Sequence, residues 1–250
     1  MIPKVIHYCW FGRNPLPPLA RKCIESWKKY LPDYKIKEWN EDNFDVNMLP
    51  YTKEAYEAKK YAFVSDFARF WILYNYGGIY FDTDVEVITN MNHIISQGDF
   101  MGCEFDITIG HKDIRVAPGL GMGAEPKRHI YKELLDIYST IHFILPDGTL
   151  NKKTIVLYTT EQFEKYGLVN NGEIQHLADT VIYPCEYFCP RPDEKGKLQI
   201  TSKTVSIHHY AGSWLDTDIK IKKIIIQILG HNLTQKIVFI KKLFRKALNR

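Results

Sequence analysis

Two aspartates, Asp82 and Asp84, directly follow the short apolar run of residues 79–81. In an extended chain, side chains two residues apart point the same way, so both carboxylates can face one cation. Such oxygen ligands suit Mn²⁺ or Mg²⁺, with phosphate oxygens and water in the remaining coordination positions. A D-x-D pair also occurs by chance in solvated loops. Its position after an apolar strand favours a cleft, because buried charges need a partner.

A second charged pair, Asp66 and Arg69, lies in the otherwise apolar stretch of residues 62–76. At a spacing of three residues, the two side chains share one face of a helix. Two interpretations stay open. The pair is either an intrahelical ion pair at the edge of the core, or a hydrogen-bonding pair aimed at the hydroxyls or phosphates of a ligand.

The elements that must position these side chains alternate between strand and helix. Apolar patterning and Gly and Pro signals predict strands over residues 4–11, 34–39, 79–81 and 85–88, and helices over residues 18–31, 53–60 and 62–76. Gly77-Gly78 ends the last of these helices directly before the aspartates. This alternation predicts an α/β sheet with its ligand site at the carboxyl ends of the strands. Later in the chain we expect helices near residues 127–140 and 160–166, and strands over residues 181–188 and 204–209.

Composition is typical of a folded soluble protein with one large domain. The 250 residues (29.3 kDa) are 45% hydrophobic and 25% charged. No apolar run is long enough to span a membrane, and the first residues lack the pattern of a signal peptide. Five cysteines without C-x-x-C spacing indicate a reducing compartment rather than a disulfide framework. Motifs of P-loop NTPases, H-E-x-x-H zinc proteases and G-x-S-x-G hydrolases are absent.

Charge is distributed unevenly along the chain. Residues 219–250 hold nine basic residues and no acidic one, which leaves 24 basic and 29 acidic residues elsewhere. A nucleic-acid binder with a basic domain is therefore not expected. In this segment lysines alternate with apolar residues at helical spacing, which predicts a basic amphipathic helix on an anionic membrane surface. Alternatively, it packs on the domain with its basic side in water. We divide the chain into a domain (1–216) and this tail (217–250).

Four segments together resemble a known family: residues 2–12, the S-D-x-x-R motif at 65–69, the G-G-x-Y-x-D-x-D motif at 77–84, and residues 208–214. They look like the D-x-D sugar-nucleotide glycosyltransferases of family 32. That family includes capsule and lipopolysaccharide enzymes and yeast initiating mannosyltransferases, and its core is similar to that of the clostridial glucosylating toxins. The resemblance is strong over residues 1–90 and thin over 180–216.

The resemblance implies a GT-A fold, Rossmann-like in binding its nucleotide sugar, and a metal-dependent, retaining hexosyltransferase. The implied donor is a nucleotide sugar, with a UDP-sugar favoured, and the implied cofactor is Mn²⁺ or Mg²⁺. The implied acceptor is a lipid-linked surface glycan of the capsule, O-antigen or lipopolysaccharide type. Such an enzyme would be cytoplasmic and peripheral on the inner face of a bacterial plasma membrane.

The resemblance also implies roles for the residues that would bind the donor. Trp10 would stack on the nucleotide base, and Asp66 and Arg69 would hold the donor sugar as part of the catalytic set. Ser213 and Trp214 would close over the diphosphate.

At the metal, Asp84 would be a direct ligand, and Asp82 would contact the ribose or a metal-bound water. Both aspartates would belong to the catalytic set. His208 would complete that shell. Glu104 is either a residue of the acceptor side or a solvated loop glutamate. The glycines at 119, 121 and 123 do not have Rossmann spacing, and we expect them to let a loop pass close to the acceptor.

Two other classes stay open. In a haloacid-dehalogenase-type phosphatase, Asp82 would be the nucleophile and Asp84 the general acid. However, Glu86 stands where that motif has Thr or Val, and the motif would begin nearer the N-terminus. The other class is a noncatalytic, membrane-associated glycan-binding protein, against which the intact charged residues argue.

Overall fold

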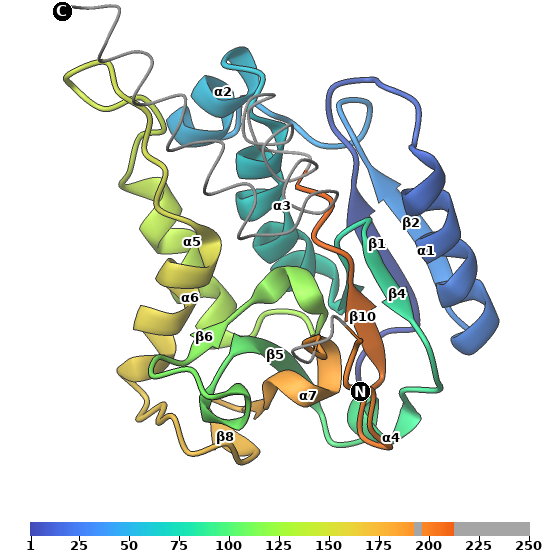
Figure 1. The fold of residues 1–250 in the computed structure, drawn as a ribbon. Helices are drawn as coiled ribbons and strands as arrows, with labels where there is room; N and C mark the ends of the chain where they lie inside the picture. Colours follow the sequence, from blue (N-terminus) through green and yellow to red (C-terminus); the bar gives the residue numbers. More distant parts are fainter. Residues whose placement is uncertain (193–196, 213–250) are drawn as a thin grey trace, which may run out of the picture. The chain divides into compact units, whose positions relative to one another are not determined.

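The computed structural model describes residues 1–192 and 197–212, which fold around a mixed eight-stranded sheet (Figure 1). The strands of this sheet are β1 (Val5–Cys9), β2 (Lys35–Trp39), β3 (Gly78–Tyr80), β5 (Asp99–Phe105), β6 (Arg115–Val116), β7 (Met122–Ala124), β8 (Gln175–Leu177) and β9 (Thr180–Tyr183). A second, small sheet pairs β4 (Val85–Val87) with β10 (Ser206–His208). The expected α/β fold is confirmed.

The strands of the central sheet follow the order β2-β1-β3-β7-β5-β9-β8, and β6 pairs with β5. β1 is parallel to β2 and β3, and β5 is parallel to β9. β7 lies between β3 and β5 and is antiparallel to both. Because the two reversals cancel, β1, β2, β3, β5 and β9 run in the same direction. Their carboxyl ends meet at one edge, where open α/β sheets bind ligands.

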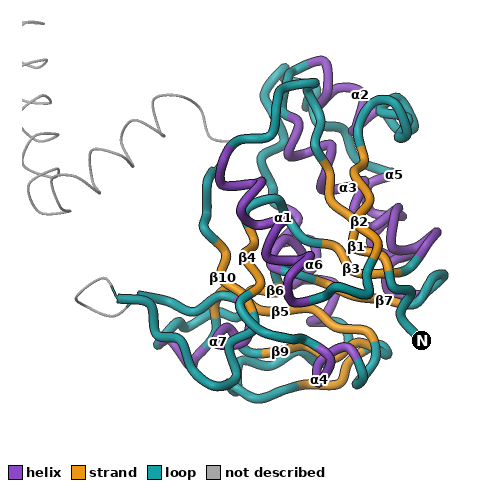
Figure 2. Tube along the Cα trace, turned by 90° about the vertical axis from the view of Figure 1, so that its right-hand side faces the viewer, coloured by secondary structure: helices purple, strands orange, loops and turns teal. Residues whose placement is uncertain are grey.

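Helices cover both faces of this sheet. The helices are α1 (Pro18–Tyr30), α2 (Pro50–Glu57), α3 (Tyr61–Tyr76), α4 (Asn92–Ile95), α5 (His129–Ser139), α6 (Ile155–Glu164) and α7 (Cys185–Phe188), with 3₁₀ turns η1 (Ile107–Ile109) and η2 (Pro118–Leu120). One hydrophobic cluster packs α2, α3, α5 and α6 on one face of the sheet. A second cluster packs α1, α7 and the small sheet on the other, and Figure 2 shows β4 and β10 beside α1.

The turn between α3 and β3 sets the direction of the strand that leads to the paired aspartates. α3 is buried along most of its length and ends at Gly77, whose N–H donates to Leu73 O at 2.9 Å. Gly77 and Gly78 both have positive φ angles, 64° and 101°. A side chain at Gly78 would also meet the backbone, because an added Cβ would lie 2.6 Å from Val5 O. Glycine is therefore required for the chain to turn from helix directly into the sheet.

The predicted helices of the first half form, but one is displaced. α1 begins at Pro18 as expected and buries one face against the sheet. The prediction of a helix over residues 53–60 is wrong at both ends, since α2 spans Pro50–Glu57. Pro50 occupies the first helical turn, where a missing N–H costs nothing, and Lys59, at a φ of 58°, lies outside the helix.

Two predictions for the second half need correction. The helix expected near residues 160–166 is α6, which begins earlier, after the extended residue Thr154. The strand expected over residues 181–188 is wrong beyond Tyr183. Pro184 lacks the N–H that a strand needs and lies directly before α7, which begins at Cys185.

The expected tail over residues 217–250 and the domain boundary at 216 lie outside the described residues, and so do Ser213 and Trp214. Within the described residues, no helix is long and apolar enough to cross a membrane. All five cysteines are buried free thiols.

Candidate active site

The two motif aspartates lie in the turn that links the central sheet to the small sheet. Asp82 follows β3, and its N–H donates to Gly119 O at 3.1 Å. Val85 N–H closes the turn by donating to Asp82 O at 3.0 Å. Asp84 directly precedes β4, and its carbonyl accepts from His209 N–H at 2.9 Å. The backbone therefore fixes both aspartates at the carboxyl edge of the sheet.

β10 brings His208 to these aspartates from the far end of the described chain. It pairs antiparallel with β4, so that His208 lies opposite Val85. His208 Nε2 is 3.1 Å from Asp84 Oδ1. One ligand atom from each of Asp82, Asp84 and His208 lies within 4.8 Å of the other two. We call these three residues the metal-ligand cluster. His209, the other member of the histidine pair, contacts Glu86 Oε2 instead, at 2.8 Å.

The cluster has the composition and burial of a divalent-cation site. Two carboxylates and one imidazole are common protein ligands for such ions, and the three side chains are 13–27% exposed. His208 Nδ1 is buried without a hydrogen-bond partner among residues 1–192 and 197–212. Although burial disfavours the imidazolium, the hydrogen bond to Asp84 and the charges of both aspartates raise the pKa of His208. The residues therefore fit a divalent cation.

Arg69 joins α3 to the motif. Its Nη2 lies 3.2 Å from Asp66 Oδ1 and 3.1 Å from Asp82 Oδ1, and its Nη1 lies 3.3 Å from Asp82 Oδ2. Nε donates to Ser65 O at 3.1 Å. The arginine side chain is only 5% exposed. Asp66 and Arg69 thus form an intrahelical ion pair on α3, and the same guanidinium also forms an ion pair with Asp82.

The carboxylates beside Arg69 have perturbed ionisation. Burial and, to a lesser extent, the nearby charge of Asp82 raise the pKa of Asp66 to about 7, against the opposing charge of Arg69. Burial also raises the pKa of Asp82, again opposed by Arg69. Tyr80 hydroxyl donates to Asp82 Oδ1 at 3.1 Å. One guanidinium therefore contacts two carboxylates, the buried Asp66 and the partly exposed Asp82.

The segment that contains Gly119 and Gly121 packs directly against the side chains of Asp82, Arg69 and Phe81. A Cβ added to Gly119 would lie 2.1 Å from Asp82 Oδ2 and 3.2 Å from Arg69 Nη1. Gly121 has a φ of 139°, and a Cβ there would lie 2.8 Å from the Phe81 ring. The absence of side chains at these positions makes room for the motif aspartate. Proximity to an acceptor stays a prediction for this segment.

Trp10 follows β1, whose carboxyl end neighbours that of β3. Its indole N–H donates to Asn14 O at 2.6 Å, and its backbone N–H donates to Trp39 O at 2.8 Å. The side chain is half-buried. Stacking on a nucleotide base stays a prediction, as do the roles of Ser213 and Trp214, which lie outside the described residues.

Sequence reasoning found only part of a polar group that lies beyond His208. Glu104, which it named, is a half-buried residue of strand β5, so its description as a solvated loop glutamate is wrong. The apolar run before it resembles the run before Asp82 and could have indicated another strand end. Arg191 and Tyr210, which contact each other at 2.9 Å, were given no role, although Tyr210 lies within residues 208–214, one of the segments that carry the resemblance.

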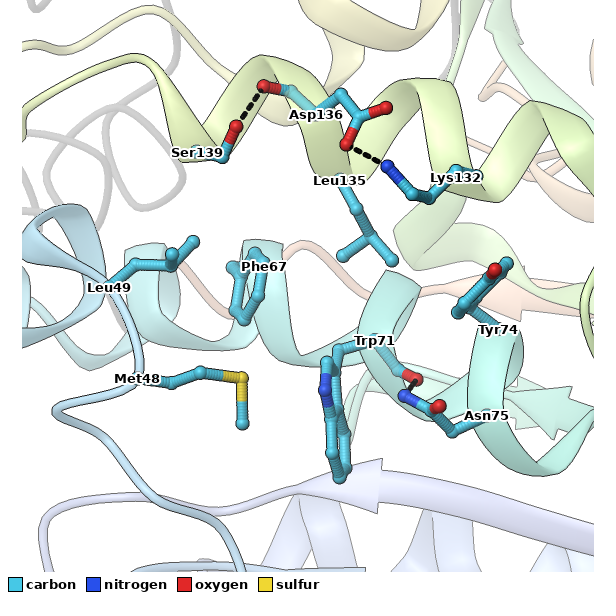
Figure 3. Close-up of a pocket in the computed structure, with 10 residues that line it drawn as sticks. All are labelled: Met48, Leu49, Phe67, Trp71, Tyr74, Asn75, Lys132, Leu135, Asp136 and Ser139. Atoms are coloured by element: carbon cyan, nitrogen blue, oxygen red, sulfur yellow. Dashed lines mark hydrogen bonds and ion pairs between the residues drawn. The ribbon is translucent and has the colours of Figure 1, made fainter.

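Figure 3 shows a largely apolar hollow. Side chains of α3 and α5 line it, together with residues before α2, among them Phe67, Trp71 and Leu135. None of the predicted site residues lines this hollow. The hollow is therefore separate from the metal-ligand cluster.

Comparison with known proteins adds independent information. The chain is 38% identical over 114 residues to "Uncharacterized glycosyltransferase L373" of Acanthamoeba polyphaga mimivirus, covering 43% of each chain. It is 29% identical over 111 residues to inositol phosphoceramide mannosyltransferase 1 of Schizosaccharomyces pombe, covering 40% of this chain and 33% of that protein. The alignments thus span less than half the length of either relative.

Among solved structures, "PaToxG Glycosyltransferase" is similar with a TM-score of 0.47 and 17% identity, over 66% of this chain and 69% of the other. A family sequence pattern matches residues 17–101, which include α3 and the paired aspartates. That family is described as "Glycosyltransferase sugar-binding region containing DXD motif", and the match covers less than half of this chain.

Proposed function

We propose that this protein is a metal-dependent, retaining glycosyltransferase that transfers a hexose from a nucleotide sugar, with a UDP-sugar as the favoured donor. The observation that carries the proposal is the convergence of Asp82, Asp84 and His208 at the carboxyl edge of the sheet. The aspartates belong to the region that matches the family. A donor diphosphate is the ligand that such a site, loaded with Mn²⁺ or Mg²⁺, would bind.

The chemistry requires positive charge at the leaving group. Transfer breaks the bond between the anomeric carbon of the sugar and a phosphate oxygen, which leaves negative charge on the diphosphate. A divalent ion held by the metal-ligand cluster would supply fixed positive charge there. Arg69 keeps the Asp82 carboxylate in one orientation through two contacts, at 3.1 and 3.3 Å. A ligand oriented in this way does not have to reorganise when the ion binds.

The remaining predicted roles concern the donor. In this proposal Asp66, which lies 3.2 Å from Arg69 Nη2, orients the donor sugar together with that arginine. Trp10 stacks on the base, at the edge shared by β1 and β3. Ser213 and Trp214 contact the diphosphate from the segment that follows β10. What supports these roles is the order of the motifs along the chain and, for Trp10 and Arg69, the edge of the sheet at which the neighbouring strands β1 and β3 end.

For the acceptor, we propose a lipid-linked surface glycan at the cytoplasmic face of a bacterial plasma membrane. Two observations support a lipid-linked acceptor. One relative is named as a mannosyltransferase of inositol phosphoceramide, a lipid. In addition, residues 219–250 carry nine basic residues among apolar ones and no acidic residue. Each such basic residue contributes about 1 kcal/mol at an anionic surface.

The tail proposal has a direct test. Flotation with vesicles containing phosphatidylglycerol should recover the full-length protein with the vesicles, and a variant that ends at residue 218 should stay behind. High salt should weaken the binding, because exposed charges are screened. Equal flotation of both proteins would refute a role for this segment.

The donor and metal are tested by thermal shift with UDP-, GDP- and CMP-sugars, each with and without Mn²⁺. A ligand at 100 times its dissociation constant stabilises the fold by about 2.7 kcal/mol, which a thermal shift detects readily. We expect a rise with UDP-sugars that requires the metal. The Asp84→Asn variant should lose this rise and all transfer, while its own stability changes by about 1 kcal/mol or less.

Asp136→Asn provides the matched control, because it removes an exposed carboxylate on α5 that pairs with Lys132. This variant should keep the full response to nucleotide sugar. An active Asp84→Asn enzyme would refute the metal assignment. If no nucleotide sugar shifts the wild type, the glycosyltransferase proposal fails, and phosphatase substrates become the next screen.

A further inference from the structure

Glu104 occupies an irregular position at the carboxyl end of β5. In the pairing of β5 with β6, Cys103 lies opposite Val116 and Phe105 lies opposite Arg115. Over this step the chain moves by two residues in β5 and by one residue in β6. Glu104 is therefore the extra residue of a β-bulge. Bulges of this kind re-aim a side chain and are frequent next to active sites.

The bulge ends at the same sheet edge as the paired aspartates. β5 and β3 run in the same direction, because β7 between them is antiparallel to both. The carboxyl end of β5 therefore lies on the edge where β3 delivers Asp82. Glu104 approaches this edge from the side of β5, whereas Asp66 and Arg69 approach it from α3.

Two polar contacts to the carbonyl of Glu104 hold the bulge in place. Arg191 Nη2 donates to Glu104 O at 2.7 Å and to the Tyr210 hydroxyl at 2.9 Å. Cys185 Sγ also donates to Glu104 O, at 3.2 Å. The guanidinium of Arg191 lies over the rings of Phe105 and Tyr210, at 4.5 and 4.9 Å from their centroids. The backbone of the bulge is thus fixed independently of the Glu104 carboxylate.

Contacts link the bulge to the metal-ligand cluster. Arg191, which donates to Glu104 O, also donates to the Tyr210 hydroxyl. The rings of Tyr210 and His208 meet edge to face, with centroids 4.1 Å apart. His208 Nε2 in turn lies 3.1 Å from Asp84 Oδ1. A continuous series of contacts therefore links the backbone of Glu104 to the second motif aspartate, and burial raises the pKa of the Glu104 carboxyl, opposed by the charges of Arg191 and His208.

We propose that Glu104 binds a hydroxyl group of the acceptor sugar and positions it for transfer, an inference that rests on the proposed function. A carboxylate accepts hydrogen bonds from hydroxyls but repels phosphate, so the donor diphosphate is not its ligand. Arg69 reaches Asp82 from α3, whereas Glu104 belongs to β5. A hexose hydroxyl that enters from the side of β5 would meet Glu104 and reach the sugar to be transferred near the metal-ligand cluster.

The test separates acceptor binding from donor binding. Methyl glycosides of glucose, galactose and mannose serve as surrogate acceptors, with a UDP-sugar and Mn²⁺. Glu104→Gln keeps the size of the side chain and one oxygen, and Glu104→Ala removes both. Since a hydrogen bond to a charged group contributes about 1.5–3 kcal/mol, we expect the acceptor KM to rise about tenfold to a hundredfold in Glu104→Ala. The rise should be smaller in Glu104→Gln, and the donor Kd should stay unchanged.

Glu133→Gln is the matched control, because Glu133 is a partly exposed glutamate on α5 that accepts from a tyrosine hydroxyl, that of Tyr166. The Glu133→Gln variant should leave the acceptor KM and the donor Kd unchanged. An unchanged acceptor KM in the Glu104 variants, or an equal rise in donor Kd, would overturn the proposal. A wild type that hydrolyses the donor but transfers to none of the glycosides would overturn the proposed acceptor class. A wild type that binds no donor would instead refute the proposed function.

Discussion

Replacing Arg69 with methionine should destabilise the protein strongly, because Arg69 compensates two carboxylates at once. Its guanidinium nitrogens lie 3.1 and 3.3 Å from the oxygens of Asp82 and 3.2 Å from Asp66 Oδ1. With a side chain that is 5% exposed, water cannot take its place. Methionine fills the space of the aliphatic stem and removes only the charge and the hydrogen bonds.

The size of this loss of stability depends on the two acids, Asp66 and Asp82, that lose their partner. Removal of one member of a buried ion pair costs about 3–5 kcal/mol. Asp66 takes up a proton at little cost near neutral pH, because its pKa is already about 7. The uncompensated charge is then mainly that of Asp82. We therefore expect the free energy of unfolding to fall by about 3 kcal/mol near pH 7.5, at the lower end of that range.

The loss should depend on pH with a definite sign. Carboxyl groups whose pKa is higher in the folded than in the unfolded state destabilise the fold only where they are ionised. The penalty in Arg69→Met is therefore largest above neutral pH and shrinks as the pH falls toward the pKa of an unfolded aspartate. Urea denaturation near pH 7.5 and near pH 5.5 measures both values.

Lys132→Met is the control for this experiment. Lys132 pairs with Asp136 on the surface of α5, where both side chains are about half exposed. Exposed pairs of this kind contribute about 0–1 kcal/mol, so little change is expected. A loss below about 1 kcal/mol in Arg69→Met, or an equal loss at both pH values, would refute the reasoning that Arg69 neutralises buried acids.

Three further predictions concern the same site. Gly119→Ala should weaken Mn²⁺ binding in titration calorimetry about tenfold or more, because its Cβ would lie 2.1 Å from Asp82 Oδ2. Gly123→Ala is the control, because its Cβ would meet the Phe100 ring at 2.3 Å. This variant should lower Tm and leave the affinity for Mn²⁺ intact. Equal losses of Mn²⁺ affinity in the two variants would contradict a specific role for Gly119 beside Asp82. Burial raises the pKa of Asp66 to about 7, so the wild type should lose stability relative to Asp66→Asn as the pH rises from about 5 to 7.5, by roughly 2 kcal/mol in urea denaturation. A constant difference between these two proteins would show that Asp66 does not titrate in this window. Chelation of divalent ions should abolish stabilisation by nucleotide sugar and leave the fold of the protein itself intact in circular dichroism.

The parts of the fold that local signals determine could be predicted from the sequence. Pro18 marks the start of α1, and Gly77-Gly78 marks the end of α3, because both residue types restrict or permit backbone angles in ways that no partner alters. The apolar runs of β1 and β3 follow from burial on both faces. The paired aspartates at the edge of the sheet follow from these elements, and the contact between Asp66 and Arg69 follows from helical spacing.

Other parts depend on pairing between distant segments, which no local pattern encodes. β7 inserts antiparallel between β3 and β5, so the shared direction of β3 and β5 is visible only in the assembled sheet. The approach of His208 to Asp84 depends on the pairing of β10 with β4. For the same reason, the bulge that places Glu104 arises from its register with β6 rather than from its own sequence.

The charges of the site indicate why cation and donor should bind together. Within the described residues, Asp66, Asp82 and Asp84 face two basic partners, Arg69 and His208. With all three acids ionised, these five groups sum to a negative charge whether or not the histidine is protonated. A diphosphate that approached this cluster alone would meet carboxylates of its own sign. A divalent cation reverses the local charge, so the affinity for the nucleotide should depend on the cation far more than the stability of the fold does.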